Sequence, residues 1–163
     1  MIYAGVNATS QIATIKKFLE DNDIKKTICL IPESDFKEEI KKGISQTKIN
    51  LKKVFYYDTE PTEITKRIEK ITRYDVRKQN LLDEIKRVES SDDPNKEKKI
   101  KNLEKKDTIG KLGFDSVIIS DFDESLKSVI TSLIYTDVST KRVYFITLNQ
   151  WLSLIHISEP TRL

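Results

Sequence analysis

Short apolar runs alternate with helical patterns along this chain, and that alternation constrains its fold more than any other feature. The runs at residues 27–31, 51–57, 116–120 and 142–148 are rich in Ile, Val, Phe and Tyr, as buried strands are. Between the runs, apolar residues recur every three or four positions, as they do on one face of a helix. Strands that are apolar throughout are typical of parallel sheets covered on both faces. The sequence therefore predicts an α/β fold with a doubly wound, mostly parallel sheet.

The longest interval between two predicted strands is helical and highly charged. One long helical pattern covers residues 61–88, residues 90–94 interrupt it, and a second helix runs to about Ile109. We expect these helices to form an antiparallel hairpin over about residues 62–112 that projects from the body of the domain. Its Lys and Glu side chains are predicted to be solvated and to form pairs one helical turn apart.

Composition limits the size of the domain and the classes of partner. With 163 residues, the chain has room for one ordinary domain. Its 29 basic and 26 acidic residues leave a net charge of +3, and acids are interleaved with bases throughout. Nucleic-acid binders usually concentrate basic charge on one face, so we expect no nucleic-acid partner. No apolar run approaches the length of a membrane span.

The residue types that support catalysis or cofactor binding are scarce. Four glycines are too few for a phosphate-binding loop of the dinucleotide or P-loop kind. The single cysteine, Cys29, lies inside the first buried run, so we expect an inert buried thiol and no disulfide within the chain. No His and Cys cluster suits zinc, and no nucleophile lies near a base. We therefore predict no catalytic residue, no metal site, no cofactor and no enzymatic activity.

The C-terminal tail does not resemble natural protein sequence. Residues 152–162 match, codon for codon, the conceptual translation of a transposon-based sequencing adapter. We therefore expect residues 152–163 to be a non-native tail that follows Trp151. The only histidine, His156, lies in that tail, so it is excluded from any functional argument.

Two pairs of neighbouring carboxyl groups needed an interpretation. Asp121 with Asp123, and Asp92 with Asp93, could in principle perform acid–base chemistry or bind a divalent cation. Each pair stands at a predicted helix start, where Asp accepts hydrogen bonds from free amides and meets the positive end of the helix dipole. We interpret both pairs as helix caps.

Three stretches together resemble the penicillin-binding protein activators of alphaproteobacteria. They are residues 56–90, 103–129 and 135–151. The pieces that carry the likeness are Tyr74-Asp75 followed by Arg77, Phe114-Asp115, Ser120-Asp121, Tyr135 to Asp137, and Trp151. That family shares the type I periplasmic-binding-protein fold of leucine/isoleucine/valine receptors. The ordered set covers nearly all of residues 1–151.

The resemblance implies a location, a partner and a domain plan. Residues 1–151 would be part of one lobe of that two-lobed fold, with the hairpin inserted, and the chain would be a fragment. Relatives of this kind lie in the periplasm, often as outer-membrane lipoproteins. We expect the signal peptide to be missing from this fragment. They stimulate peptidoglycan synthases, the penicillin-binding proteins, by contact. The resemblance thus implies a non-enzymatic binding and regulatory module of the cell envelope.

An alternative within the same superfamily is the solute receptor of an ABC transporter for amino acids or other small polar ligands. In open α/β sheets, ligands bind outside the carboxyl ends of the strands. The residues expected at that edge are Glu33, Ser34, Tyr57, Asp58, Asp121, Phe122 and Asn149. Asp121 is the candidate partner for a ligand ammonium group. Simple amino-acid receptors generally lack a long inserted hairpin, which favours the activator interpretation.

Overall fold

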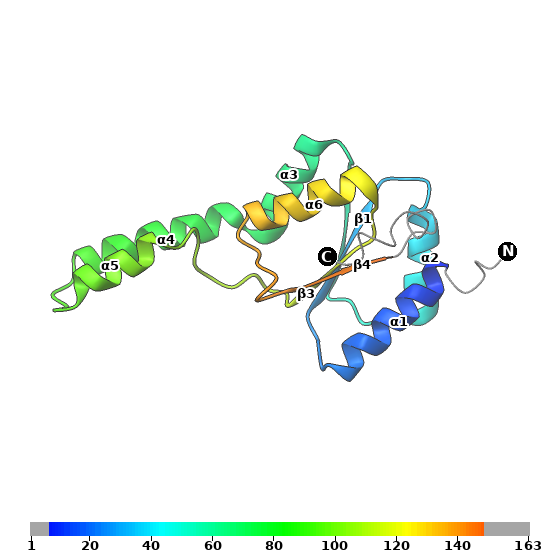
Figure 1. Ribbon diagram of the computed structural model, residues 1–163, viewed down its shortest axis with the longest axis horizontal. Coiled ribbons are helices and arrows are strands. Elements are labelled where there is room, and N and C mark those ends of the chain that lie inside the picture. The colour runs from blue at the N-terminus through cyan, green and yellow to red at the C-terminus, as the bar shows by residue number, and fades with distance from the viewer. Residues whose placement is uncertain (1–6, 149–163) are drawn as a thin grey trace, which may run out of the picture.

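The computed structural model describes residues 7–148 as a parallel sheet with helices on both faces (Figure 1). The strands are β1 (Thr27–Pro32), β2 (Lys53–Tyr57), β3 (Ser116–Ile119) and β4 (Tyr144–Thr147). The helices are α1 (Ala8–Asp21), α2 (Lys37–Thr47), α3 (Pro61–Thr72), α4 (Tyr74–Glu89), α5 (Lys96–Glu104) and α6 (Asp123–Tyr135). The predicted fold class is confirmed. The expected tail of residues 152–163 lies outside the described residues.

The sheet is ordered β2-β1-β3-β4, and all three pairings are parallel. Cys29 in β1 lies beside Val54 on one side and Ile118 on the other. Every residue of β1 and β3 is buried, as their apolar runs predict, whereas β2 and β4 are partly exposed at the two edges. The edge strands begin at Lys53 and Tyr144, later than the sequence patterns indicate.

On one face of the sheet, α1 and α2 pack against each other and against the strands. Asn7 begins α1, because its side chain accepts a hydrogen bond from the Ser10 amide at 2.8 Å. The two helices approach closely at Gly43 of α2, where an added Cβ would lie 2.8 Å from Ile12 Cδ1. Their apolar stripes cover the Cys29 side of β1 in a continuous cluster.

The opposite face of the sheet is covered by α3 and α6. Ile64 and Ile68 of α3 and Val129 and Leu133 of α6 are fully or almost fully buried in one apolar cluster that includes residues of β1 and β3. A buried side chain of this size contributes about 1.5–3 kcal/mol relative to an exposed one. The two helix pairs therefore supply most of the apolar contact that stabilises the sheet.

The single long helix predicted for residues 61–88 is wrong. Arg73 adopts a left-handed conformation with φ of 56°, so α3 ends at Thr72 and α4 begins at Tyr74. The left-handed conformation is uncommon for a residue with a Cβ. The chain changes direction here because the buried residues of α3 pack in the cluster on the sheet, whereas Tyr74 and Arg77 at the start of α4 contact residues at the end of α6. Neither Gly nor Pro marks the break in the sequence.

The projecting hairpin is therefore α4 with α5, and it begins at Tyr74 rather than near Thr62. Figure 1 shows the two helices side by side, extending away from the sheet. α4 is 16 residues long and has buried residues at Tyr74, Arg77, Leu81 and Val88, whereas α5 has none. The expectation of a projecting antiparallel hairpin is correct for these two helices. α3 belongs to the layers of the body, because its apolar stripe packs against the sheet and α6.

Candidate functional site

The structure places six of the seven residues expected at the ligand-binding edge at the carboxyl ends of three neighbouring strands. Glu33 and Ser34 follow β1, Tyr57 ends β2 and Asp58 follows it, and Asp121 and Phe122 come after β3. The seventh, Asn149, lies outside the described residues. Parallel strands end at one edge of a sheet, so the predicted residues share that edge. Whether they bind a ligand stays a prediction.

Asp121 is the centre of this edge and is almost completely buried, with 2% of its surface exposed. Its Oδ2 accepts a hydrogen bond from the Tyr57 hydroxyl at 2.5 Å. Its Oδ1 accepts from the Phe122 amide at 2.7 Å and from the Ser125 hydroxyl at 2.6 Å. Because β1 lies between β2 and β3, the bond between Tyr57 and Asp121 joins strands that are not neighbours. We call Tyr57, Asp121 and Ser125 the strand-end cluster.

In the strand-end cluster, Tyr57 cannot act as a general base, whereas Asp121 could pair with a positively charged group. Burial raises the pKa of Tyr57, and the hydrogen bond to Asp121 raises it further. The phenol is therefore a neutral donor at ordinary pH and is no general base. Within residues 7–148, no Lys or Arg forms an ion pair with Asp121. The ammonium group of a ligand could pair with the Asp121 carboxylate. It would reach the carboxylate only after the side chains of Tyr57 and Ser125 move.

The other predicted edge residues make local contacts. Glu33 accepts a hydrogen bond from Lys37 of α2 at 2.8 Å. The Asp58 carboxylate accepts from the Glu60 amide at 2.9 Å in the turn before α3. Phe122 packs edge-to-face against Phe36, with ring centroids 5.0 Å apart. These contacts stabilise the turns at the edge of the sheet. Among the acidic residues predicted at this edge, Asp121 is the buried one.

The interpretation of the two acid pairs as helix caps is wrong. The residues at the N-caps are Phe122 for α6 and Asn95 for α5, and neither makes a side-chain capping bond. Asp121 instead accepts from the Phe122 amide, and Asp93 accepts from the Asn95 amide at 2.8 Å.

Across the described residues, no group of three or more His, Cys, Asp or Glu is arranged to hold a metal ion. No helix in this part of the chain is long and apolar enough to cross a membrane.

The base of the hairpin holds a second polar cluster, centred on Arg77, which is 1% exposed. Its Nη1 donates to the carbonyls of Thr72, at 3.2 Å, and Thr136, at 2.9 Å. Its Nη2 donates to the Thr108 hydroxyl and the Asp137 carbonyl, both at 3.0 Å. One guanidinium thus holds the ends of α3 and α6 and the segment after α5. We call Arg77 with these four partners the hairpin-base cluster.

Residues that carry the family resemblance and are far apart in the sequence lie close together at the base of the hairpin. The rings of Tyr74 and Tyr135 have centroids 5.3 Å apart, and Arg77 Nη2 lies 4.0 Å from Asp137 Oδ2. Burial lowers the pKa of Arg77, and the charge of Asp137 opposes that effect. Sequence reasoning did not identify Arg77 as a buried organising residue. A signal was present, because Arg77 precedes Leu81 by four positions and so lies on the apolar stripe of α4.

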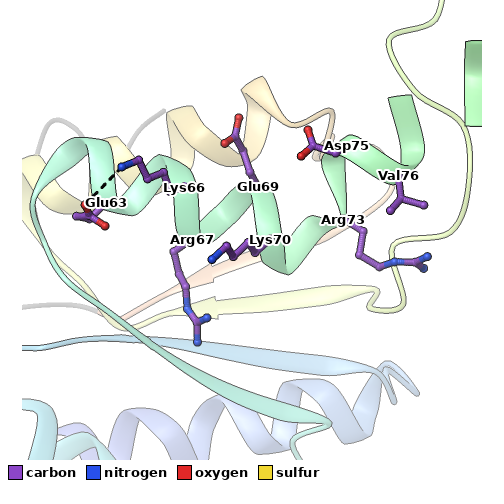
Figure 2. Close-up of a pocket in the computed structure, with 8 residues that line it drawn as sticks. All are labelled: Glu63, Lys66, Arg67, Glu69, Lys70, Arg73, Asp75 and Val76. Atoms are coloured by element: carbon purple, nitrogen blue, oxygen red, sulfur yellow. Dashed lines mark ion pairs between the residues drawn. The ribbon is translucent and has the colours of Figure 1, made fainter. Parts of the chain in front are cut away.

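A third feature is a shallow depression along the outer side of α3 and the start of α4 (Figure 2). Its lining mixes acidic and basic residues with one apolar residue and consists of Glu63, Lys66, Arg67, Glu69, Lys70, Arg73, Asp75 and Val76. Lys66 pairs with Glu63 at 3.7 Å, and Arg67 donates to the Tyr56 carbonyl at 3.2 Å beside the open edge of β2. Such mixed, exposed charge selects no particular ligand, so the depression is not a candidate site.

Comparisons with known proteins identify no family for this chain. No protein-family model matches it, and no curated protein matches it. Among solved structures, it is similar to a LacI family transcription regulator from Clostridium acetobutylicum, with a TM-score of 0.47 and 12% identity. The match covers 95% of this chain and 48% of that one, so the chain spans about half the length of that structure. A likeness this distant carries no argument about the fold or the function of this chain.

Proposed function

We propose that this chain belongs to a non-enzymatic regulatory protein of the cell envelope that stimulates peptidoglycan synthases by direct contact. The observation that carries the proposal is the α4–α5 hairpin, which extends beyond the sheet and is fastened at its base by Arg77. The sequence resemblance to penicillin-binding protein activators supports the choice of partner. It also supports a periplasmic or outer-membrane location.

The surface of the hairpin suits contact with another protein. On α5, residues 96–101 hold four lysines and one glutamate, and most of the helix is exposed. α4 adds exposed acids and bases, among them Asp83, Lys86 and Glu89. Charge of both signs on an accessible surface favours a complementary partner and makes the association sensitive to salt.

The groups that could perform covalent or acid–base chemistry support a non-enzymatic role. Burial raises the pKa of Cys29 to about 12, so its thiol stays protonated at neutral pH. The raised pKa of Tyr57 likewise keeps its phenol neutral. Neither group supplies an anion that could act as a nucleophile or base, and both lie inside the body of the domain.

The test is direct binding between the full-length protein and purified peptidoglycan synthases, with matched charge-reversal variants. The hairpin variant carries Lys98→Glu and Lys101→Glu on α5. The control carries Lys17→Glu and Lys41→Glu on α1 and α2, on the opposite side of the molecule. We expect binding to weaken with salt and to be lost in the hairpin variant alone. Equal binding by both variants would contradict the proposal.

One observation favours a second candidate, the solute receptor. Asp121 is a buried carboxylate whose three hydrogen-bond donors are all neutral, so a ligand ammonium would supply the missing positive charge. Calorimetry of the full-length protein against a panel of amino acids tests this candidate. Tight binding that is lost in Asp121→Asn, with no synthase bound, would favour the receptor over the regulator.

A further inference from the structure

Two neighbouring helices run between the strand-end cluster and the hairpin-base cluster. α3 starts shortly after Tyr57, and α6 starts shortly after Asp121. Both helices then cross the same face of the sheet and pack against each other. Thr65 Oγ1 of α3 and Ser132 Oγ of α6 share a hydrogen bond 3.0 Å long. Helices of 12 and 13 residues span about 18–20 Å each, so the two clusters are well separated.

A buried hydrogen bond joins the two helices at their starting ends. Tyr57, which donates to Asp121, is three residues before the N-cap of α3. Asp121 accepts in turn from Ser125, in the first turn of α6. The position of the α6 start therefore depends on the position of the β2 end that leads into α3.

A single guanidinium joins the two helices at their far ends. Arg77 donates to Thr72, the last residue of α3, and to Thr136 and Asp137, which directly follow α6. The carbonyls at a helix C-terminus lack partners within the helix and carry partial negative charge, so a cation between two such ends is favourable. Because Arg77 belongs to α4, the same bonds fix the direction in which the hairpin leaves the body.

The hairpin-base cluster also leaves Arg77 incompletely bonded. Nε of Arg77 is buried with no hydrogen-bond partner among the described residues. The Asp137 carboxylate lies 4.0 Å from Nη2 and accepts instead from the Thr108 hydroxyl, at 2.6 Å. A small shift of α4 would let the guanidinium bond the carboxylate directly, in a second arrangement with stronger, charge-assisted bonds. Two discrete arrangements are what a coupling element requires.

From this geometry we propose that the α3–α6 helix pair couples the strand-end cluster to the direction of the α4–α5 hairpin. A change in the bond between Tyr57 and Asp121 shifts the helix starts relative to each other. At the far ends, Arg77 then exchanges its bond to the Thr108 hydroxyl for a bond to the Asp137 carboxylate. The coupling concerns the described residues alone. It stands whether the hairpin binds a synthase or another partner, and whether or not a ligand occupies the edge.

The experiment is amide hydrogen exchange on the whole 163-residue chain carrying Tyr57→Phe, which removes only the hydroxyl. The reporters are two amides at the hairpin base, Ile109, which donates to the Arg77 carbonyl, and Val138, which donates to the Leu133 carbonyl. We expect both to exchange roughly 2- to 30-fold faster, the range that corresponds to measured couplings through such networks.

The matched control is Ser120→Ala at the same edge of the sheet. It removes a buried hydrogen bond of 2.7 Å from the Ser120 hydroxyl to the Leu30 carbonyl, next to Asp121 but on the α1–α2 face. Exchange is compared after correction for the global stability of each variant, measured by urea unfolding. A larger corrected effect of Tyr57→Phe than of Ser120→Ala at Ile109 and Val138 supports the coupling. Equal corrected effects, or none, would overturn it.

Discussion

The body of the domain and its helical hairpin are stabilised in different ways. In the body, every residue of β1 and β3 is buried, and helices cover both faces of the sheet. In the hairpin, α5 has no buried residue and packs along α4. The body therefore depends on apolar burial, whereas the hairpin depends on the polar cluster at its base. Stability that differs this much along one chain allows the hairpin to open while the body stays folded.

The largest expected difference is between two leucine truncations, one in each region. Leu30 of β1 is fully buried, so Leu30→Ala should lower the free energy of unfolding by about 2–5 kcal/mol. Leu103 of α5 is only half-buried, so Leu103→Ala should cost about 1 kcal/mol or less. Urea unfolding followed by circular dichroism measures both. Equal losses would mean that hairpin and body form one cooperative unit of similar packing.

The same contrast explains what the sequence could and could not reveal. The strands at the centre of the sheet were predictable because they are apolar on both faces, so their composition reports their burial directly. The break at Arg73 was not, because the sequence has no Gly or Pro there and contacts of the helices on either side determine the turn. For Arg77, burial depends on carbonyls contributed by residues as distant as Thr136 and Asp137. A residue-by-residue reading assigns such a side chain to solvent.

In the candidate site, too, the positions of single residues were predictable from the sequence, but the contact between them was not. The sequence correctly placed Tyr57 and Asp121 at strand ends, because each follows or ends an apolar run. It did not pair them, because their proximity depends on the strand order β2-β1-β3, which brings residues 64 positions apart within hydrogen-bond distance. Strand order is a property of the whole sheet and leaves no local mark in the sequence.

The next prediction tests the base of the hairpin with two arginines of the same helix. Arg77→Met keeps much of the apolar volume and removes the bonds to four partners, so we expect a loss of at least about 2 kcal/mol, since hydrogen bonds to charged groups contribute about 1.5–3 kcal/mol each. Arg87, near the end of α4, is exposed and pairs only with Glu84, at 2.6 Å. Arg87→Met should leave the urea midpoint unchanged. Similar midpoints for the two variants would show that Arg77 does not secure the hairpin.

A third prediction concerns the body, whose free energy of unfolding should fall at alkaline pH because of Tyr57. The folded state raises the pKa of Tyr57, chiefly through burial, above the value of about 10 expected in the unfolded chain. Below pH 10 this contribution is complete. As pH rises further, the unfolded state releases a proton that the folded state keeps, so the free energy of unfolding falls with a slope that increases toward about 1.4 kcal/mol per pH unit.

Urea unfolding at several pH values from 9 to 11 measures this slope. Tyr57→Phe should reduce the slope relative to the unmodified chain, whereas Ser120→Ala, which keeps the phenol, should not. Cys29, whose pKa burial raises to about 12, adds a loss of the same sign in all three proteins. Ser120→Ala also removes a hydrogen bond that lowers the Cys29 pKa, so this variant can only keep or increase the slope. An unchanged slope in Tyr57→Phe would contradict the buried, neutral phenol.

The smallest expected effect on the body follows from cutting the hairpin at its tip. The turn between α4 and α5, residues 90–95, lies at the far end of the projection, and nearly all of its residues are partly or fully exposed. Subtilisin at low concentration should cut there before it cuts the buried strand β3, because a protease needs an accessible, locally unfolded segment. The cut leaves Arg77 on α4 bonded to the body and breaks none of the sheet contacts. The nicked protein should therefore unfold within about 0.5 kcal/mol of the intact chain, the usual range for changes away from a core. First cleavage within residues 117–119, or a nicked protein that unfolds several-fold more readily, would show that the hairpin tip supports the body after all.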